Sequence, residues 1–136
     1  MNVVNAVTPS VQQITDFFGA EEGPFVMINL LKFKARAEYP DGRDAELTGF
    51  EAYMRYGIAV RAELERVGAR AGHAGPVTGL LLGEVEELWD MVAMAHYPSL
   101  AAMRAMVEHP DYQAIAVHRT AGLAGQLNIK MQDALA

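Results

Sequence analysis

The chain has 136 residues, of which 51% are hydrophobic and 21% charged, and this size and balance are typical of one globular domain. The formal net charge of -6 and the lack of a basic stripe argue against nucleic acid or an anionic membrane as a partner. The absence of cysteine excludes disulfides, and no stretch approaches the roughly 18 apolar residues of a membrane helix. The N-terminus has no basic or long apolar region, so we expect no signal peptide and a cytoplasmic protein.

We expect one domain over residues 1–136, with a helical extension over residues 1–23. In that extension Thr8 suits the cap of a short helix, Pro9 its first position and Gly19 a left-handed stop. The apolar run from 25 to 34 that follows is typical of a strand.

A turn signal inside residues 35–47 predicts a loop, after which Thr48 caps a long helix that Gly68 ends. Apolar and small residues recur in this helix at steps of three and four: Phe50, Tyr53, Gly57, Val60, Leu64 and Val67. Further elements are expected as a strand at 77–82, a turn at 83–87, a strand at 88–97, helices at 99–107 and from 110 to about 119, and a strand near 126–132.

This order of elements predicts an α+β fold of the ferredoxin-like βαββαβ type. It has a four-stranded antiparallel sheet, both long helices on one of its faces, and the extra N-terminal helix. The first strand is apolar on both faces, with Phe25, Met27, Leu31 and Phe33 on one and Val26, Ile28 and Leu30 on the other. Because the helices cover one face only, we expect a homodimer through the sheet face opposite the helices. The N-terminal helix is the alternative cover.

Several segments resemble a family of small bacterial proteins known as a domain of unknown function, and the resemblance spans about residues 24–129. The segments that carry it are Met27–Phe33, Thr48–Tyr56, Trp89-Asp90, Tyr97–Ser99, His109–Tyr112 and His118-Arg119. The resemblance implies the dimeric α/β-barrel superfamily, in which a ligand usually sits between the sheet and the helices of each subunit. Relatives include cofactor-independent monooxygenases of antibiotic biosynthesis, muconolactone isomerase-like proteins and heme-binding peroxidases, so the resemblance indicates the fold and not the chemistry.

Three polar residues are candidate ligand-binding groups in such a cavity. Asn29 is the one polar residue on the helix-facing side of the first strand, where it either orients a ligand or ties down a neighbouring loop or strand end. Tyr53 and Tyr56 lie on or beside the core stripe of the long helix and combine an apolar ring with a polar tip. Ordinary core packing is the alternative for both.

The third strand supplies further candidates. Asp90 is a candidate general base and His96, on the same face, a candidate acid or base, whereas a surface Asp and a backbone-bonded His are the alternatives. Trp89 is a candidate ligand contact or a packing anchor. Arg119 either clamps a substrate carboxylate or complements the dipole at the end of the last helix.

The four histidines lack ligand spacing and no nucleotide-binding motif is present, so we expect no metal and no cofactor. These features favour a protein that binds a small apolar or aromatic metabolite between sheet and helices, with cofactor-independent oxygenase or isomerase-like activity as an extension of that role. The alternative is a non-catalytic dimeric structural or interaction module.

Overall fold

A computed structural model describes residues 1–133 of the chain. Its elements follow one another as α1 (Val11–Phe18), β1 (Phe25–Phe33), α2 (Gly49–Arg66), β2 (Arg70–Pro76), β3 (Met91–Tyr97), α3 (Leu100–Glu108), α4 (Pro110–Gly122) and β4 (Leu123–Gln132). Apart from α1, this is the predicted βαββαβ order with the second helix divided into α3 and α4.

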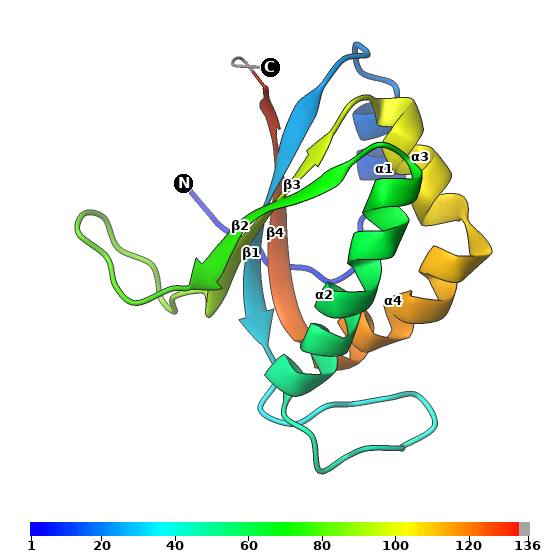
Figure 1. Cartoon of the computed structure of the whole chain (residues 1–136). Helices are drawn as coiled ribbons and strands as arrows, with labels where there is room; N and C mark the ends of the chain where they lie inside the picture. Colours follow the sequence, from blue (N-terminus) through cyan, green and yellow to red (C-terminus); the bar gives the residue numbers. More distant parts are fainter. Residues whose placement is uncertain (134–136) are drawn as a thin grey trace.

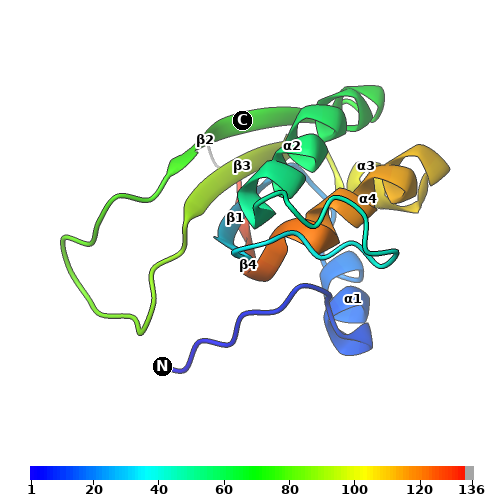
Figure 2. The same cartoon turned by 90° about the horizontal axis from the view of Figure 1, so that it is seen from below.

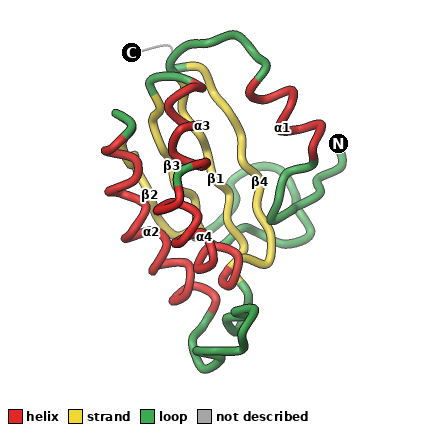
Figure 3. Tube along the Cα trace, turned by 90° about the vertical axis from the view of Figure 1, so that its right-hand side faces the viewer, coloured by secondary structure: helices red, strands yellow, loops and turns green. Residues whose placement is uncertain are grey.

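The four strands form one antiparallel sheet in the order β2-β3-β1-β4, which confirms the ferredoxin-like α+β fold. Figures 1 and 2 show α2, α3 and α4 on one face of the sheet and α1 on the same side, beside β4. Figure 3 shows this helical layer in front of the strands. None of the helices described is both long enough and apolar enough to cross a membrane.

Local signals place the ends of the helices as predicted in three cases. Thr48 and Glu51 form a reciprocal capping box at the start of α2, and Ser99 caps α3. Gly68 follows α2 with φ of +78°, the left-handed conformation that glycine adopts at low cost. These contacts are local in sequence, which is why the sequence alone indicates them.

The expected stop of α1 at Gly19 is wrong in its conformation, because this glycine has φ of -87°. The cap of α1 is Ser10, two residues later than the expected Thr8. Gln13 completes a capping box with Ser10, because the Ser10 hydroxyl accepts from the Gln13 N–H and the Gln13 side chain accepts from the Ser10 N–H. Two backbone N–H groups at the start of the helix are bonded in this way.

The expected strand at 77–82 is also wrong. The strand that pairs with β3 is β2, which begins two residues after Gly68, at Arg70, and ends where Pro76 faces Met91. This edge strand reads Arg-Ala-Gly-His-Ala-Gly-Pro and is largely exposed, so it has no apolar alternation to detect. The apolar residues at 77–82 instead belong to a loop that projects from the sheet, where Leu81 is fully exposed.

The backbones of α2 and α4 touch where the two helices cross, at Gly49 and Gly122. A Cβ on Gly122 would lie 2.8 Å from the backbone nitrogen of Tyr53 and inside contact distance of the Gly49 carbonyl. The end of β1 joins the same point, since the Lys34 N–H donates to the Gly122 carbonyl (2.8 Å) and the Gly49 N–H donates to the Lys34 carbonyl (3.0 Å). The crossing therefore fixes α2 and α4 to each other and to the end of the central strand.

The loop between β1 and α2 is fastened to α4 by a polar contact. The buried Tyr39 hydroxyl lies 2.7 Å from His118 Nδ1, and Arg55 Nη1 donates to the same hydroxyl (3.3 Å). Burial, together with the guanidinium groups of Arg55 and Arg43, lowers the pKa of His118. The contact between Tyr39 and His118 therefore holds the loop against the helix.

We expect Gly122→Ala to lower the free energy of unfolding by about 2 kcal/mol or more, because the added methyl group overpacks a backbone contact. Gly57→Ala is the matched control, since its Cβ would meet only the Met54 side chain at 3.9 Å and alanine favours a helix interior. Urea unfolding followed by circular dichroism measures both. Equal effects of the two substitutions would contradict the close approach.

Candidate ligand-binding cavity

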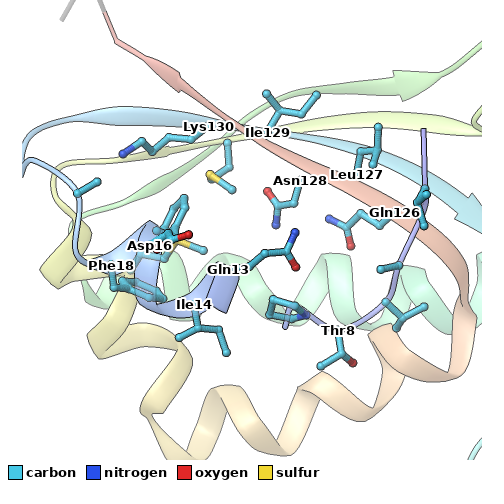
Figure 4. A pocket seen from close by; sticks show the side chains of 18 of the residues that line it. Thr8, Gln13, Ile14, Asp16, Phe18, Gln126, Leu127, Asn128, Ile129 and Lys130 are labelled. Atoms are coloured by element: carbon cyan, nitrogen blue, oxygen red, sulfur yellow. The ribbon is translucent and has the colours of Figure 1, made fainter. Parts of the chain in front are cut away.

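Two adjoining cavities, each of about 590 Å³, occupy the space on the helical side of the sheet. We call them the helix-side cavity, between the sheet and α2 to α4, and the α1-side cavity, between β4 and the N-terminal segment with α1. Figure 4 shows the α1-side cavity, with Gln126 and Asn128 directed into it from β4 and Gln13 on α1 opposite. Arg119, Gln126 and Met27 line both volumes, so the two meet at this point.

Small side chains on facing surfaces explain why the helix-side cavity stays open. Ala93 and Ala95 form part of its lining on β3, and Gly57 lines it from α2. Most of the remaining lining is apolar and comes from Met27, Met91, Val60, Leu64, Met103, Met106 and Val107. A largely apolar cavity of this volume is of the kind that encloses small organic ligands in proteins.

A chain of hydrogen bonds crosses the sheet at the boundary between the two cavities. Arg119 Nη2 donates to Gln126 Oε1 (2.7 Å), and Gln126 Nε2 donates to Asn29 Oδ1 (2.7 Å). Asn29 Nδ2 in turn donates to the carbonyl of Ala93 in β3 (3.1 Å). We call these three side chains the Arg–Gln–Asn relay. Because an arginine can only donate, it determines the orientation of both amides.

Tyr53 lies on the roof of the helix-side cavity and is only 8% exposed. Burial raises the pKa of its hydroxyl to about 12, although the positive charge of Arg119 acts in the opposite direction. The hydroxyl therefore keeps its proton at neutral pH and can act as a hydrogen-bond donor. Within residues 1–133 it has no hydrogen-bond partner.

Two further tyrosines meet at the other side of this cavity. The hydroxyls of Tyr56 on α2 and Tyr112 on α4 lie 3.0 Å apart. Burial and the neighbouring Tyr112 raise the pKa of Tyr56 well above its ordinary value. The Tyr56 hydroxyl therefore keeps its proton, and the two hydroxyls together form a polar spot on an apolar wall.

The structure brings together four of the residues singled out in the sequence: Asn29, Tyr53, Tyr56 and Arg119 line the helix-side cavity. Asn29 lines the cavity while both polar atoms of its amide are bonded to neighbouring strands, so its role toward a ligand stays a prediction.

The three candidates around β3 lie elsewhere. His96 points to the opposite sheet face, because its neighbours Ala95 and Tyr97 line the cavity and strand residues alternate. Asp90 accepts from the Phe33 N–H (2.8 Å) and from Lys32 Nζ (3.2 Å), so it secures the end of β1. Trp89 Nε1 donates to Asn5 Oδ1 (2.8 Å) and anchors the N-terminal segment.

Gln126 and Asn128 are cavity residues that the sequence did not single out. Both lie on the helix-facing side of β4, where Asn128 is paired with Asn29 and Gln126 with Leu31. The sequence does contain a sign of this face, because polar Gln126 and Asn128 alternate with apolar Leu127 and Ile129. Its meaning depends on the register between β4 and β1, which the sequence does not reveal.

One group of metal-ligating side chains lies away from the cavity centre. Ligand atoms of Glu63, His109 and Asp111 fall within 4.8 Å of one another. Arg66 is paired with Glu63 and lies 4.0 Å from Asp111, so a guanidinium already supplies the positive charge there. A cation would have to displace it.

Comparisons with known proteins agree with this fold. A family model described as a domain of unknown function, DUF1330, matches residues 44–131. A protein of unknown function from Rhodopseudomonas palustris is 33% identical over 95% of this chain and 97% of its own, with a TM-score of 0.82. The methylated form of that protein is 34% identical over 96% of both chains, with a TM-score of 0.84. A search of curated proteins found no match.

More distant structures share the fold alone. A dimeric protein of unknown function with a ferredoxin-like fold from Bacteroides fragilis is 13% identical over 81% of this chain and 96% of its own, with a TM-score of 0.53. A candidate antibiotic biosynthesis monooxygenase from Caulobacter crescentus is 13% identical over 82% of this chain and 90% of its own, also with a TM-score of 0.53.

We expect Asn29→Leu and Gln126→Leu each to lower the free energy of unfolding by about 1–3 kcal/mol, because each leaves a buried or half-buried amide without its partner. The double variant should lower the free energy of unfolding by less than the sum of the two single effects, since it removes both amides and leaves neither without its partner. Chemical denaturation of the unmodified protein, the two single variants and the double variant measures this double-mutant cycle. Asn128→Leu, on the exposed part of the same strand, is the control with little expected effect, and strictly additive effects would argue against the relay.

Proposed function

This chain belongs to the DUF1330 family, and we propose that it binds a small apolar or aromatic metabolite in the helix-side cavity. The observation that carries the proposal is an apolar volume of about 590 Å³ into which a few polar groups converge from both the sheet and the helices. A module with a purely structural role has no need of such a space, because interiors normally pack without voids much larger than a water molecule.

The polar groups support binding rather than proton transfer by the two residues expected to perform it. Asp90 and His96 lie outside the cavity, and no histidine lines either volume within residues 1–133. The groups that do line it are tyrosine hydroxyls, the amides of Asn29, Gln126 and Asn128, the guanidinium groups of Arg61, Arg104 and Arg119, and the Glu108 carboxylate, which is paired with Arg104 (3.1 Å). These groups suit the orientation of a ligand. The proposal is therefore one of recognition, and the oxygenase or isomerase-like activity expected from the resemblance is no part of it.

We further propose a homodimer formed through the open face of the sheet. Apolar side chains of three strands cover this face, and Ile129 and Met131 remain 44% and 45% exposed. The loop at 77–90 projects away from the helices with Leu81 and Leu82 almost fully exposed, which extends the apolar surface. The B. fragilis protein with the same fold is described as dimeric, which adds support.

For the cavity, we expect the uncharged fluorescent probe N-phenyl-1-naphthylamine to bind with one site per chain and a large gain in emission. Ala93→Phe places a ring on the cavity floor and should abolish binding, and Ala93→Leu, a milder change, should weaken it. Ala114→Phe is the matched control on the exposed side of α4 and should bind as the unmodified protein does. Thermal melts verify that each variant is folded. Undiminished binding in folded Ala93→Phe would place the probe elsewhere and reject the site.

For the dimer, we expect light scattering at micromolar concentration to report twice the mass of one chain. Ile129→Glu should shift the mass toward that of one chain, because a buried unpaired carboxylate is strongly unfavourable in an interface. Ile58→Glu, the same substitution on the exposed surface of α2, is the control and should leave the mass unchanged. A monomeric mass for the unmodified protein would refute the proposal.

A further inference from the structure

We propose that Arg119 and Tyr53 form an anion subsite inside the helix-side cavity, so that the ligand is an apolar or aromatic carboxylic acid whose carboxylate lies against these two residues. This inference rests on the proposed function and names its ligand class. Nothing in the apolar lining alone would select a charged ligand.

The first observation is a positive charge without a counter-charge. The Arg119 side chain is partly buried, and in the part of the chain that is described its one polar contact is the bond from Nη2 to the neutral amide of Gln126. Asp16, the carboxylate that lines the α1-side cavity with it, accepts from Gln12 and forms no ion pair with Arg119. A partly buried guanidinium whose other N–H groups have no acceptor among the described residues is suited to bind an anion.

The second observation is that the protein holds this guanidinium in place. Gln126 accepts from Arg119, and Asn29 accepts from Gln126 at the same distance of 2.7 Å. Asn29 is anchored to the backbone of the neighbouring strand, so the relay runs from the helix layer to the centre of the sheet. Gln126 and Asn29 are therefore positioning residues that leave the remaining N–H groups of Arg119 available to a ligand.

The third observation is an unused donor beside that charge. Tyr53 is more than nine-tenths buried, its hydroxyl has no partner within residues 1–133, and the charge of Arg119 is close enough to act on its pKa. Because burial keeps the hydroxyl protonated, it donates a hydrogen bond to an anion instead of competing with it. A planar carboxylate can accept from the guanidinium and from this hydroxyl together.

The chemistry of the lining narrows the class further. One guanidinium and one neutral hydroxyl match a single negative charge better than a phosphate, which carries more charge and is usually held by several donors. Lys130, the other cation that lines the α1-side cavity, lies over the rings of Phe17 and Phe25, 5.3 and 5.7 Å from their centroids. Of the other charged side chains that line the helix-side cavity, Arg104 and Glu108 are paired with each other (3.1 Å) and Arg61 is exposed. Most of the remaining lining consists of methionine, valine, leucine and alanine side chains, which suits an apolar body.

The test uses displacement of N-phenyl-1-naphthylamine by 2-naphthoate and by its uncharged amide, 2-naphthamide. We expect the acid to bind about tenfold more tightly than the amide, as charge-assisted hydrogen bonds would give. Arg119→Gln should bring this ratio close to one, because it weakens binding of the acid much more than binding of the amide, and Arg119→Lys should restore part of the ratio. Arg36→Gln removes the same charge from an exposed loop and is the control that should keep the full ratio.

Two further variants distinguish a residue that contacts the ligand, Tyr53, from a residue that positions Arg119, Asn29. Tyr53→Phe should lower the affinity for the acid several-fold with little change for the amide, and Asn29→Leu should lower the acid-to-amide ratio while probe binding persists. Equal affinities of acid and amide in the unmodified protein, with the probe still bound in the cavity, would refute the anion subsite and leave the proposed function intact. Failure of the probe and of both competitors to bind would contradict both proposals.

Discussion

At the crossing of α2 and α4 the two backbones lie in contact, because neither Gly49 nor Gly122 carries a side chain that would keep them apart. The end of β1 bonds to both glycines, so one point joins α2, α4 and β1. From this point α2 carries Tyr53 onto the roof of the cavity, and α4 reaches it with Arg119 in its last turn. The positions of the proposed ligand contacts depend on this close approach.

The same arrangement explains why the interior is not filled. The helices are held at the end of β1, while small residues such as Ala93 and Gly57 line the space further along the sheet. Dense packing would favour stability there, so an open apolar space beside an uncompensated guanidinium is a cost to the unliganded fold. Such a cost is typical of binding sites, where the ligand supplies the missing contacts.

Part of the site was visible in the sequence for identifiable reasons. Asn29 interrupts an apolar strand face, and Tyr53 falls on the core stripe of a capped helix. The strand and helix periodicities of the apolar residues are therefore enough to single out both. His96 shows the limit of that reasoning, because a titratable residue in a strand can face either side and the sequence did not determine which. The edge strand β2 was misplaced since an exposed strand of Gly, Ala and His lacks the apolar alternation that marks a strand.

What the sequence by itself determined about this protein is local: the capped starts of α2 and α3, the end of α2 at Gly68, the apolar strands and, through their order, the ferredoxin-like fold. These features depend on residues a few positions apart, whose physics is contained in short stretches of chain. Only the tertiary structure decided the register that places Gln126 between Arg119 and Asn29, and the helix crossing that leaves a cavity above them. Residues 97 positions apart meet in that relay, and no local preference encodes such a meeting.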